Sequence, residues 1–142
     1  MHRGHLSVVL INQRSEIERL SEAVERFGEA QHLLADDVAA VNLVLDEIVI
    51  NIIAHAYDDE HEHQIHVSLT LEGDLLTIQV ADDGKPFNPL DAAPPNFDLP
   101  IDDRPIGGLG IHIVRSTVDA IEHRRAGGRN ILTMKKTMTG AT

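Results

Sequence analysis

The sequence predicts an α/β two-layer sandwich, that is, an α+β arrangement in which one mixed β-sheet is covered on one face by three helices. Segments with the apolar spacing of helices alternate with segments that have the two-residue period of strands. Their order is strand, two helices, two strands, a long loop, one helix and two strands. At 142 residues, we expect one domain over residues 1–142 with a single hydrophobic core.

The first elements are an edge strand and a helix with one buried face. His5–Ile11 is a short apolar run of the β type. Ser15 then offers an N-cap, with acidic residues in the first turn behind it. Apolar residues recur at spacings of three and four, so we expect this helix to run to about Leu34 with one side in the core.

The next helix carries the first unusual feature of the sequence. It is capped by Asp36 or Asp37 and is apolar nearly all round, which predicts a central helix packed on both sides. Glu47, Asn51 and His55 interrupt it four residues apart and so form one polar stripe. A carboxylate can act as a general base, and an amide oxygen is a suitable ligand for Mg²⁺. The alternative is that these side chains satisfy neighbouring backbone groups.

The second half predicts a hairpin, a long loop, a helix and two more strands. Gln64–Leu71 and Leu75–Ala81 flank a short glycine turn, which is typical of a β-hairpin. Residues 88–106 are rich in Pro and Asp and have no periodicity, which indicates a functional loop or lid. After the third helix, Ala120–Arg125 and Asn130–Lys136 are expected to be strands joined by two glycines.

Two short motifs lie at the ends of these elements. Asp82-x-Gly84 follows a strand, where Asp82 could accept a hydrogen bond from an exocyclic amine and Gly84 could let the backbone approach a flat base; a plain Asx turn is the alternative. Gly107-Gly108-Leu109-Gly110 opens the third helix, where backbone amides bind anions. It is neither a P-loop nor a complete dinucleotide fingerprint, and a lid hinge would explain it equally well.

Composition excludes several classes of function. The chain has 23 acidic against 12 basic residues, a formal charge of −11, and only 3% aromatic residues, so we expect no direct binding of nucleic acid or of a membrane. Without cysteine there is neither a disulfide nor a thiolate metal site. No signal peptide and no run of about 18 apolar residues is apparent, so we expect a cytoplasmic protein. His61, His63 and His66 fit a solvated turn better than a metal site.

Taken together and in this order, the motifs resemble the Bergerat-type (GHKL) ATP-binding fold of histidine kinases and gyrase-type ATPases. More narrowly, they are similar to those of the anti-sigma-factor serine/threonine kinases. The resemblance spans nearly the whole chain. The matching segments are Leu45–Asn51 with Ala54–Tyr57, Asp82–Phe87, and Gly107–Ile111 with Val114 and Asp119.

The resemblance implies ATP or ADP as ligand, with Mg²⁺. By position, Asn51 would bind Mg²⁺ and Glu47 would orient or deprotonate the attacking hydroxyl. Asp82 would recognise the adenine amino group above Gly84. The remaining candidates for nucleotide contacts are His55, Phe87, Gly107, Gly108, Leu109 and Gly110.

One departure concerns the lid arginine that helps place the γ-phosphate in the sporulation-type kinases. The nearest candidate, Arg104, is displaced by a residue or two and precedes Pro105. The resemblance implies a sigma factor and an anti-sigma-factor antagonist as partners, and leaves open whether the chain forms a homodimer. Two alternatives remain for the function: a catalytically weak nucleotide-dependent binding module, or a detached histidine-kinase catalytic domain.

Overall fold

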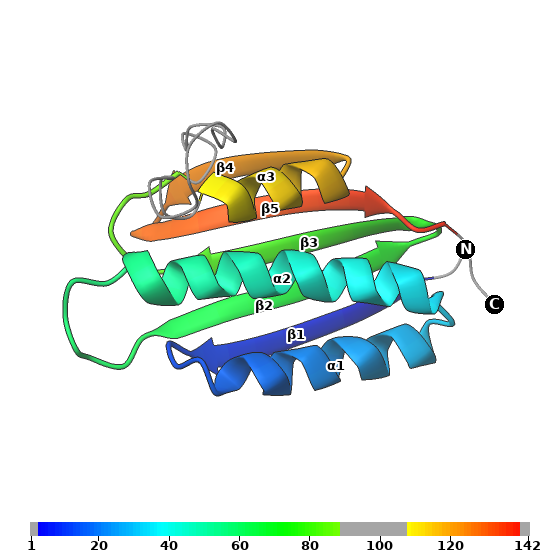
Figure 1. The fold of residues 1–142 in the computed structure, drawn as a ribbon, viewed down its shortest axis with the longest axis horizontal. Helices are drawn as coiled ribbons and strands as arrows, with labels where there is room; N and C mark the ends of the chain where they lie inside the picture. Colours follow the sequence, from blue (N-terminus) through cyan, green and yellow to red (C-terminus); the bar gives the residue numbers. More distant parts are fainter. Residues whose placement is uncertain (1–2, 89–107, 140–142) are drawn as a thin grey trace.

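A computed structural model describes residues 3–88 and 108–139 of the chain (Figure 1). Several elements form where the sequence shows apolar periodicity, as in the helix of Glu16–Ala30 and the hairpin of Gln64–Glu72 and Leu75–Asp82. In chain order the elements are β1 (Arg3–Ile11), α1 (Glu16–Ala30), α2 (Ala35–His55), β2 (Gln64–Glu72), β3 (Leu75–Asp82), α3 (Gly108–Thr117), β4 (Ala120–Ala126) and β5 (Arg129–Thr137).

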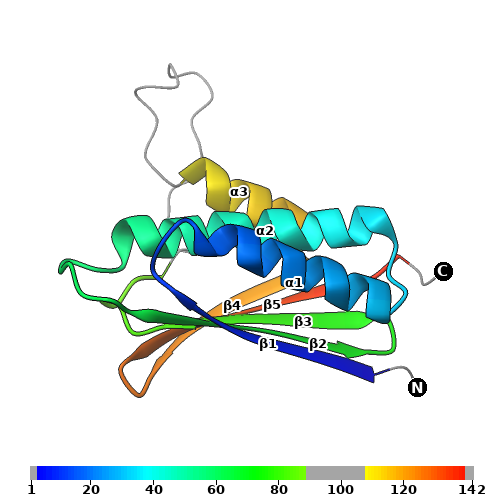
Figure 2. The same ribbon diagram turned by 90° about the horizontal axis from the view of Figure 1, so that it is seen from below.

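The described strands form a five-stranded sheet in the order β1-β2-β3-β5-β4, and the three described helices lie on one of its faces (Figure 2). The predicted α+β two-layer architecture is confirmed, with β1 at an edge. The sheet is antiparallel throughout, however, and not mixed. Two helices separate β1 from β2, so the chain returns in the opposite direction. In addition, β5 lies between β3 and β4, which run the same way and would otherwise form a parallel pair.

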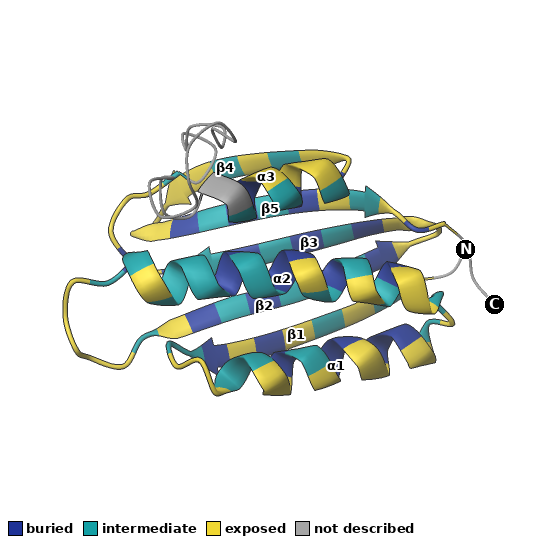
Figure 3. Cartoon of the chain, viewed as in Figure 1, coloured by how far each residue is buried: buried dark blue, intermediate teal, exposed yellow. Residues whose placement is uncertain are grey.

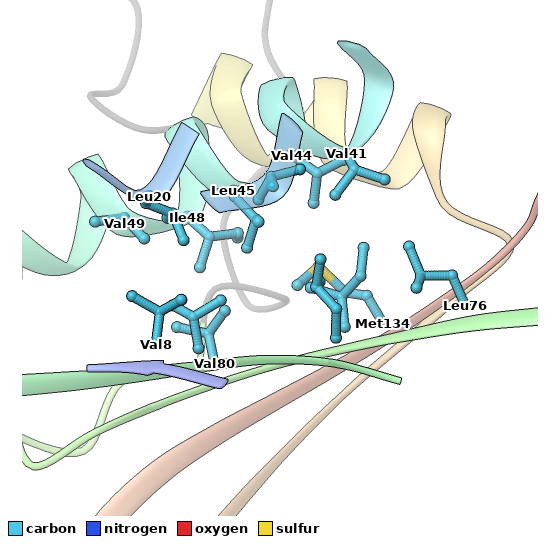
Figure 4. Packing of buried hydrophobic residues seen from close by; sticks show 14 of the residues in the cluster. Val8, Leu20, Val41, Val44, Leu45, Ile48, Val49, Leu76, Val80 and Met134 are labelled. Atoms are coloured by element: carbon cyan, nitrogen blue, oxygen red, sulfur yellow. The ribbon is translucent and has the colours of Figure 1, made fainter. Parts of the chain in front are cut away.

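The core lies between the sheet and the inner faces of the helices. Burial alternates along the central strands, as Figure 3 shows, because successive side chains point to opposite faces. From α2, Leu45 and Ile48 point toward Val80 and Met134 on the sheet (Figure 4). Burial of each such side chain is worth about 1.5–3 kcal/mol relative to exposure.

The helix α2 is central, as expected, with α1 on one side and α3 on the other. Its outward stripe is open to solvent, and Leu43 is 43% exposed. The sequence showed no run of apolar residues long enough to span a membrane. By length and composition, however, α2 could cross one, with a mean hydropathy of 1.7. A core helix meets the same criterion, and the inner face of α2 packs on the sheet.

The helix ends differ from those expected. α1 ends at Ala30 rather than near Leu34, because His32 adopts a left-handed φ of 57°. Ser15 makes no side-chain cap; instead the Glu16 carboxylate accepts a hydrogen bond from the backbone N–H of Ile11 at 3.1 Å.

Neither aspartate at the start of α2 caps that helix, whose N-cap position is Leu34. The buried Asp37 carboxylate instead accepts hydrogen bonds from the backbone N–H and the hydroxyl of Thr139, both at 2.9 Å. Asp37 therefore fastens the end of the described chain to α2. The predicted lid at residues 88–106 lies outside the described residues except for Asn88.

Candidate functional site

Glu47 and Asn51 lie one turn apart on α2 and face the first turn of α3. A Cβ added to Gly110 would lie 2.5 Å from Glu47 Oε2 and 3.9 Å from Asn51 Nδ2. Within residues 3–88 and 108–139, neither polar side chain makes a hydrogen bond or ion pair. These two polar groups are therefore available to a ligand and are not occupied by the backbone of the described chain.

Beside this pair lies a pocket between the C-terminal half of α2 and the sheet. It encloses about 410 Å³ of empty space, part of which opens to solvent. Half of its lining residues are aliphatic, and its exposed walls are mainly apolar, which suits a flat ring. The lining residues are Ile48, Asn51, Ile52, Ala56, Val80, Asp82, Phe87, His123, Asn130 and Leu132.

Asp82 is the buried carboxylate of this pocket, with 5% of its surface exposed. Its Oδ1 accepts hydrogen bonds from the backbone N–H of Gly84 at 2.9 Å and from Asn130 Nδ2 at 3.2 Å. Among the residues that the structure describes, no donor reaches Oδ2. One oxygen is therefore free to accept a hydrogen bond from a ligand in the pocket.

The turn after Asp82 packs tightly against the end of α2. A Cβ on Gly84 would lie 2.6 Å from the carbonyl oxygen of Ala56, so only glycine fits without movement of the backbone. The backbone N–H of Lys85 donates to the same Ala56 carbonyl at 2.9 Å. From β4, Arg125 donates to the carbonyl of Gly84 at 2.7 Å. These bonds hold the turn between Asp82 and Phe87, two residues that line the pocket.

Asn130 is the site residue that the sequence analysis missed. It is 5% exposed, and its Nδ2 donates both to Asp82 and to the carbonyl of Lys85, at 3.2 and 2.9 Å. Its Oδ1 accepts from the backbone N–H of Phe87 at 3.2 Å and lies 3.2 Å from His123 Nε2. One carboxamide thus fixes the carboxylate and the turn together.

A signal for Asn130 was present in the strand pattern. It occupies the inward position of the alternation that continues through Leu132 and Met134, where an apolar residue is the norm. A polar residue in the buried register of a strand requires hydrogen-bond partners, and here Asp82 and the turn after it supply them.

A cluster of Tyr57, Asp59 and His63 contacts the same turn through Asp83. The His63 ring bridges Asp59, at 2.7 Å from Nε2, and Asp83, at 3.1 Å from Nδ1. It also stacks on Tyr57 with ring centroids 4.1 Å apart. The bond to Asp59 and the carboxylate of Asp83 raise the pKa of His63, while the bond to His63 lowers the pKa of Asp59. Burial, followed by nearby carboxylates, raises the pKa of Tyr57.

The described residues contain no group of three or more His, Cys, Asp or Glu side chains placed to hold a metal ion. His63 is instead engaged by two carboxylates and is largely covered, and His66 lies on β2, so the solvated turn expected for these histidines was wrong for both.

The other predicted site residues do not all lie at the pocket. His55 ends α2 and does not line the pocket, whereas Phe87 does, with 43% of its surface exposed. Gly108 and Leu109 open α3. Gly107 and Arg104 lie outside the described residues. No ligand tests these assignments, so the roles of the site residues stay predictions.

Comparison with known proteins gives matches along most of the chain. Residues 12–136 match the family described as the histidine kinase-like ATPase domain. The chain is 31% identical over 94 residues to the serine/threonine-protein kinase BtrW of Bordetella bronchiseptica, covering 66% of each chain. It is 29% identical over 104 residues to the serine-protein kinase RsbW of Bacillus mycoides, covering 70% of this chain and 64% of the relative. The chain thus spans just under two thirds of the length of these relatives.

Two solved structures resemble the fold. The RsbU and RsbW domains of Rv1364c from Mycobacterium tuberculosis match with a TM-score of 0.69 at 15% identity, over 95% of this chain and 32% of that one. The Acinetobacter baumannii histidine kinase AdeS matches with a TM-score of 0.52 at 15% identity, over 94% of this chain and 68% of that one. At this identity the likeness concerns the fold alone.

Proposed function

The chain belongs to the histidine kinase-like ATPase domain family, and we propose that it is an ATP-binding, anti-sigma-factor-type regulatory protein with serine/threonine kinase activity towards an antagonist protein. Relatives named as serine or serine/threonine kinases support the kinase activity. The observation that carries the proposal is the unbonded pair Glu47 and Asn51, which faces Gly110 beside a pocket with a half-free carboxylate.

The residues present fit a magnesium nucleotide. The amide oxygen of Asn51 would hold Mg²⁺, for which such an oxygen is a suitable ligand. The free oxygen of Asp82 would accept a hydrogen bond from the adenine amino group, with Phe87 beside the ring. Backbone amides at the start of α3, including those of Gly108 and Gly110, would face the phosphates, because a helix N-terminus attracts anions. When bound, Mg²⁺ would neutralise charge on the phosphate oxygens.

Glu47 is the residue that we assign to proton transfer. Its carboxylate would accept the proton of a serine or threonine hydroxyl as that oxygen bonds to the γ-phosphorus and the bond to ADP breaks. Gly110 leaves room for the carboxylate, since any larger residue would occupy its position. A carboxylate without a partner in the described chain is free to take this proton.

The proposed partners are proteins: a sigma factor that is sequestered and an antagonist that is phosphorylated. The net charge of −11 opposes direct contact with DNA, so regulation of transcription would act through these partners. For this proposed role the protein would act in the cytoplasm, where both ATP and sigma factors are found. Cell fractionation and sedimentation would test the location and a homodimer.

Calorimetric titration with ATP and ADP, with and without Mg²⁺, tests nucleotide binding. We expect Asn51→Ala to lose the dependence on Mg²⁺ and to weaken ATP binding by at least about tenfold, because the metal ligand is removed. Asn42→Ala is the matched control, since Asn42 lies on the same helix outside the pocket. Equal behaviour of the two variants would contradict the assignment.

Transfer of radiolabelled phosphate to candidate antagonists tests the kinase activity. We expect label that is stable in acid, as on serine or threonine, and loss of transfer in Glu47→Gln but not in the exposed Glu22→Gln. Label that is lost in acid but stable in alkali would indicate a histidine-kinase domain instead. ATP binding and partner regulation that survive Glu47→Gln, with no label on any partner, would indicate a binding module.

A further inference from the structure

A groove separate from the nucleotide pocket runs along the outer surface between α1 and α2. Its empty space amounts to about 1100 Å³, a value that includes solvent at its open side. Among the described residues, its lining shares none with that of the nucleotide pocket. Leu33, Val38 and Leu43 contribute apolar surface to it. The 43% exposure of Leu43 leaves a large aliphatic side chain facing solvent within this groove.

The shape of the groove follows from how the two helices pack. Gly28 on α1 lies directly against Val38 on α2, so the helices approach closely at that level. On α2 the lining residues follow one stripe from Ala35 to Asp46, a length of about 17 Å at 1.5 Å per residue. This length matches about three turns of a helix laid alongside.

The groove is acidic, and three carboxylates line it. These are Glu25 and Glu29 on α1 and Asp46 on α2, and among the described residues no lysine or arginine lines it. The side-chain oxygen of Asn42 is buried there without a hydrogen-bond partner among the described residues. Burial, and then the neighbouring Glu47, raise the pKa of Asp46, so a cation placed beside it would relieve an unfavourable charge.

We propose that this groove binds a short amphipathic helix of a protein partner, with an apolar ridge against Leu43 and Val38 and with arginine or lysine beside the three carboxylates. An apolar helix face in a groove is a recurring mode of recognition. The flanking cations would satisfy the carboxylates and provide a donor for Asn42. The proposal does not depend on nucleotide binding.

A second copy of the chain matches this groove poorly. α2 has no lysine or arginine, and the two basic residues of α1 are Arg19 and Arg26. Arg19 is already held by Glu16 and by the carbonyl of Val9. Neither helix therefore offers a row of cations to a neighbouring copy. Nucleic acid and anionic lipid carry the same sign of charge as the groove.

The test uses the full chain and a fluorescein-labelled synthetic helix with leucine at i, i+3, i+4 and i+7 and arginine on both flanks. A peptide of the same composition in scrambled order is the control. At physiological salt we expect anisotropy to report binding of the amphipathic peptide at least about tenfold tighter than of the scrambled one. Leu43→Asn, and the pair Glu25→Lys with Glu29→Lys, should each weaken that binding by about tenfold or more.

Substitutions that make the same charge change outside the groove show whether peptide binding depends on the groove or only on the net charge of the protein. Glu60→Lys with Glu122→Lys makes the same change in net charge on exposed residues outside the groove and should leave binding within about twofold. Equal binding of both peptides, or equal loss in both charge-reversed pairs, would overturn the proposal. So would a groove variant that converts a dimer to a monomer in sedimentation, since the occupant would then be a second copy. Unfolding curves and ATP titrations of every variant show that the chain is folded.

Discussion

Replacement of Gly110 by alanine should slow phosphoryl transfer and leave the free energy of unfolding nearly unchanged. The added Cβ would lie 2.5 Å from Glu47 Oε2, nearer than two such atoms can approach. The obstructed atom is the far end of a flexible side chain, so Glu47 can rotate away without any movement of the backbone. The helices therefore stay in place, but the carboxylate leaves the position in which it faces the start of α3.

The expected change in stability is small because two effects oppose each other. Alanine is favoured over glycine within a helix by up to about 1 kcal/mol, and Gly110 is part of α3. An unfavourable rotamer at Glu47 costs about 0.5–1.5 kcal/mol. The free energy of unfolding should thus change by less than about 1 kcal/mol. In contrast, a displacement of about 1 Å at a reacting group can cost about a hundredfold in rate.

Urea unfolding and phosphoryl transfer at saturating ATP measure the two quantities on the same preparation. We expect Gly110→Ala to fold normally and to transfer phosphate about a hundredfold more slowly. Ser116→Ala is the control, because it also favours helix near the end of α3, where the Ser116 hydroxyl donates to the carbonyl of His112. Transfer at the normal rate, or a loss of several kcal/mol of stability, would refute the argument that Gly110 makes room for a functional carboxylate.

Three further outcomes can be measured with purified protein. Asp82→Asn can keep an oxygen as the acceptor for Gly84 and Asn130 while an amide donor replaces the free Oδ2, so calorimetry should show ATP binding weakened by about tenfold or more with little change in unfolding. The raised pKa of His63 means that its stabilising contribution is complete below pH 6.5 and is lost as the pH rises through the elevated pKa; urea midpoints of the His63→Asn variant should lack this decline. Asp37→Ala removes both bonds to Thr139 and should cost about 2–3 kcal/mol in urea unfolding, whereas the exposed Asp36→Ala should cost under about 0.5 kcal/mol.

Local patterns in the sequence account for much of the fold. The hairpin of β2 and β3 was expected within one residue of its observed bounds, because strand alternation and a glycine turn are properties of neighbouring residues. The family assignment, made from motif order, is confirmed by the match over residues 12–136. The predicted end of α1, near Leu34, was wrong by several residues, because the left-handed conformation of His32 cannot be inferred from apolar spacing.

Long-range packing determined the features that the sequence did not reveal. The antiparallel strand order depends on β5 entering between β3 and β4, which no local pattern specifies. Asn130 was missed because its partner Asp82 lies 48 residues earlier in the chain. The strand alternation shows that Asn130 points inward. That Asn130 bonds to Asp82, however, depends on the pairing of β3 with β5.

The sequence alone determined that a carboxylate and a carboxamide share one stripe of the central helix, because helical geometry relates residues four apart wherever the helix lies. It also determined that a strand ends in Asp82-x-Gly84 and that α3 begins among glycines. Only the tertiary structure decided that Gly110 would face Glu47 and that Asp82 would keep one oxygen free. Those relations depend on how separate elements pack, and packing involves atoms that are close in space but distant along the chain.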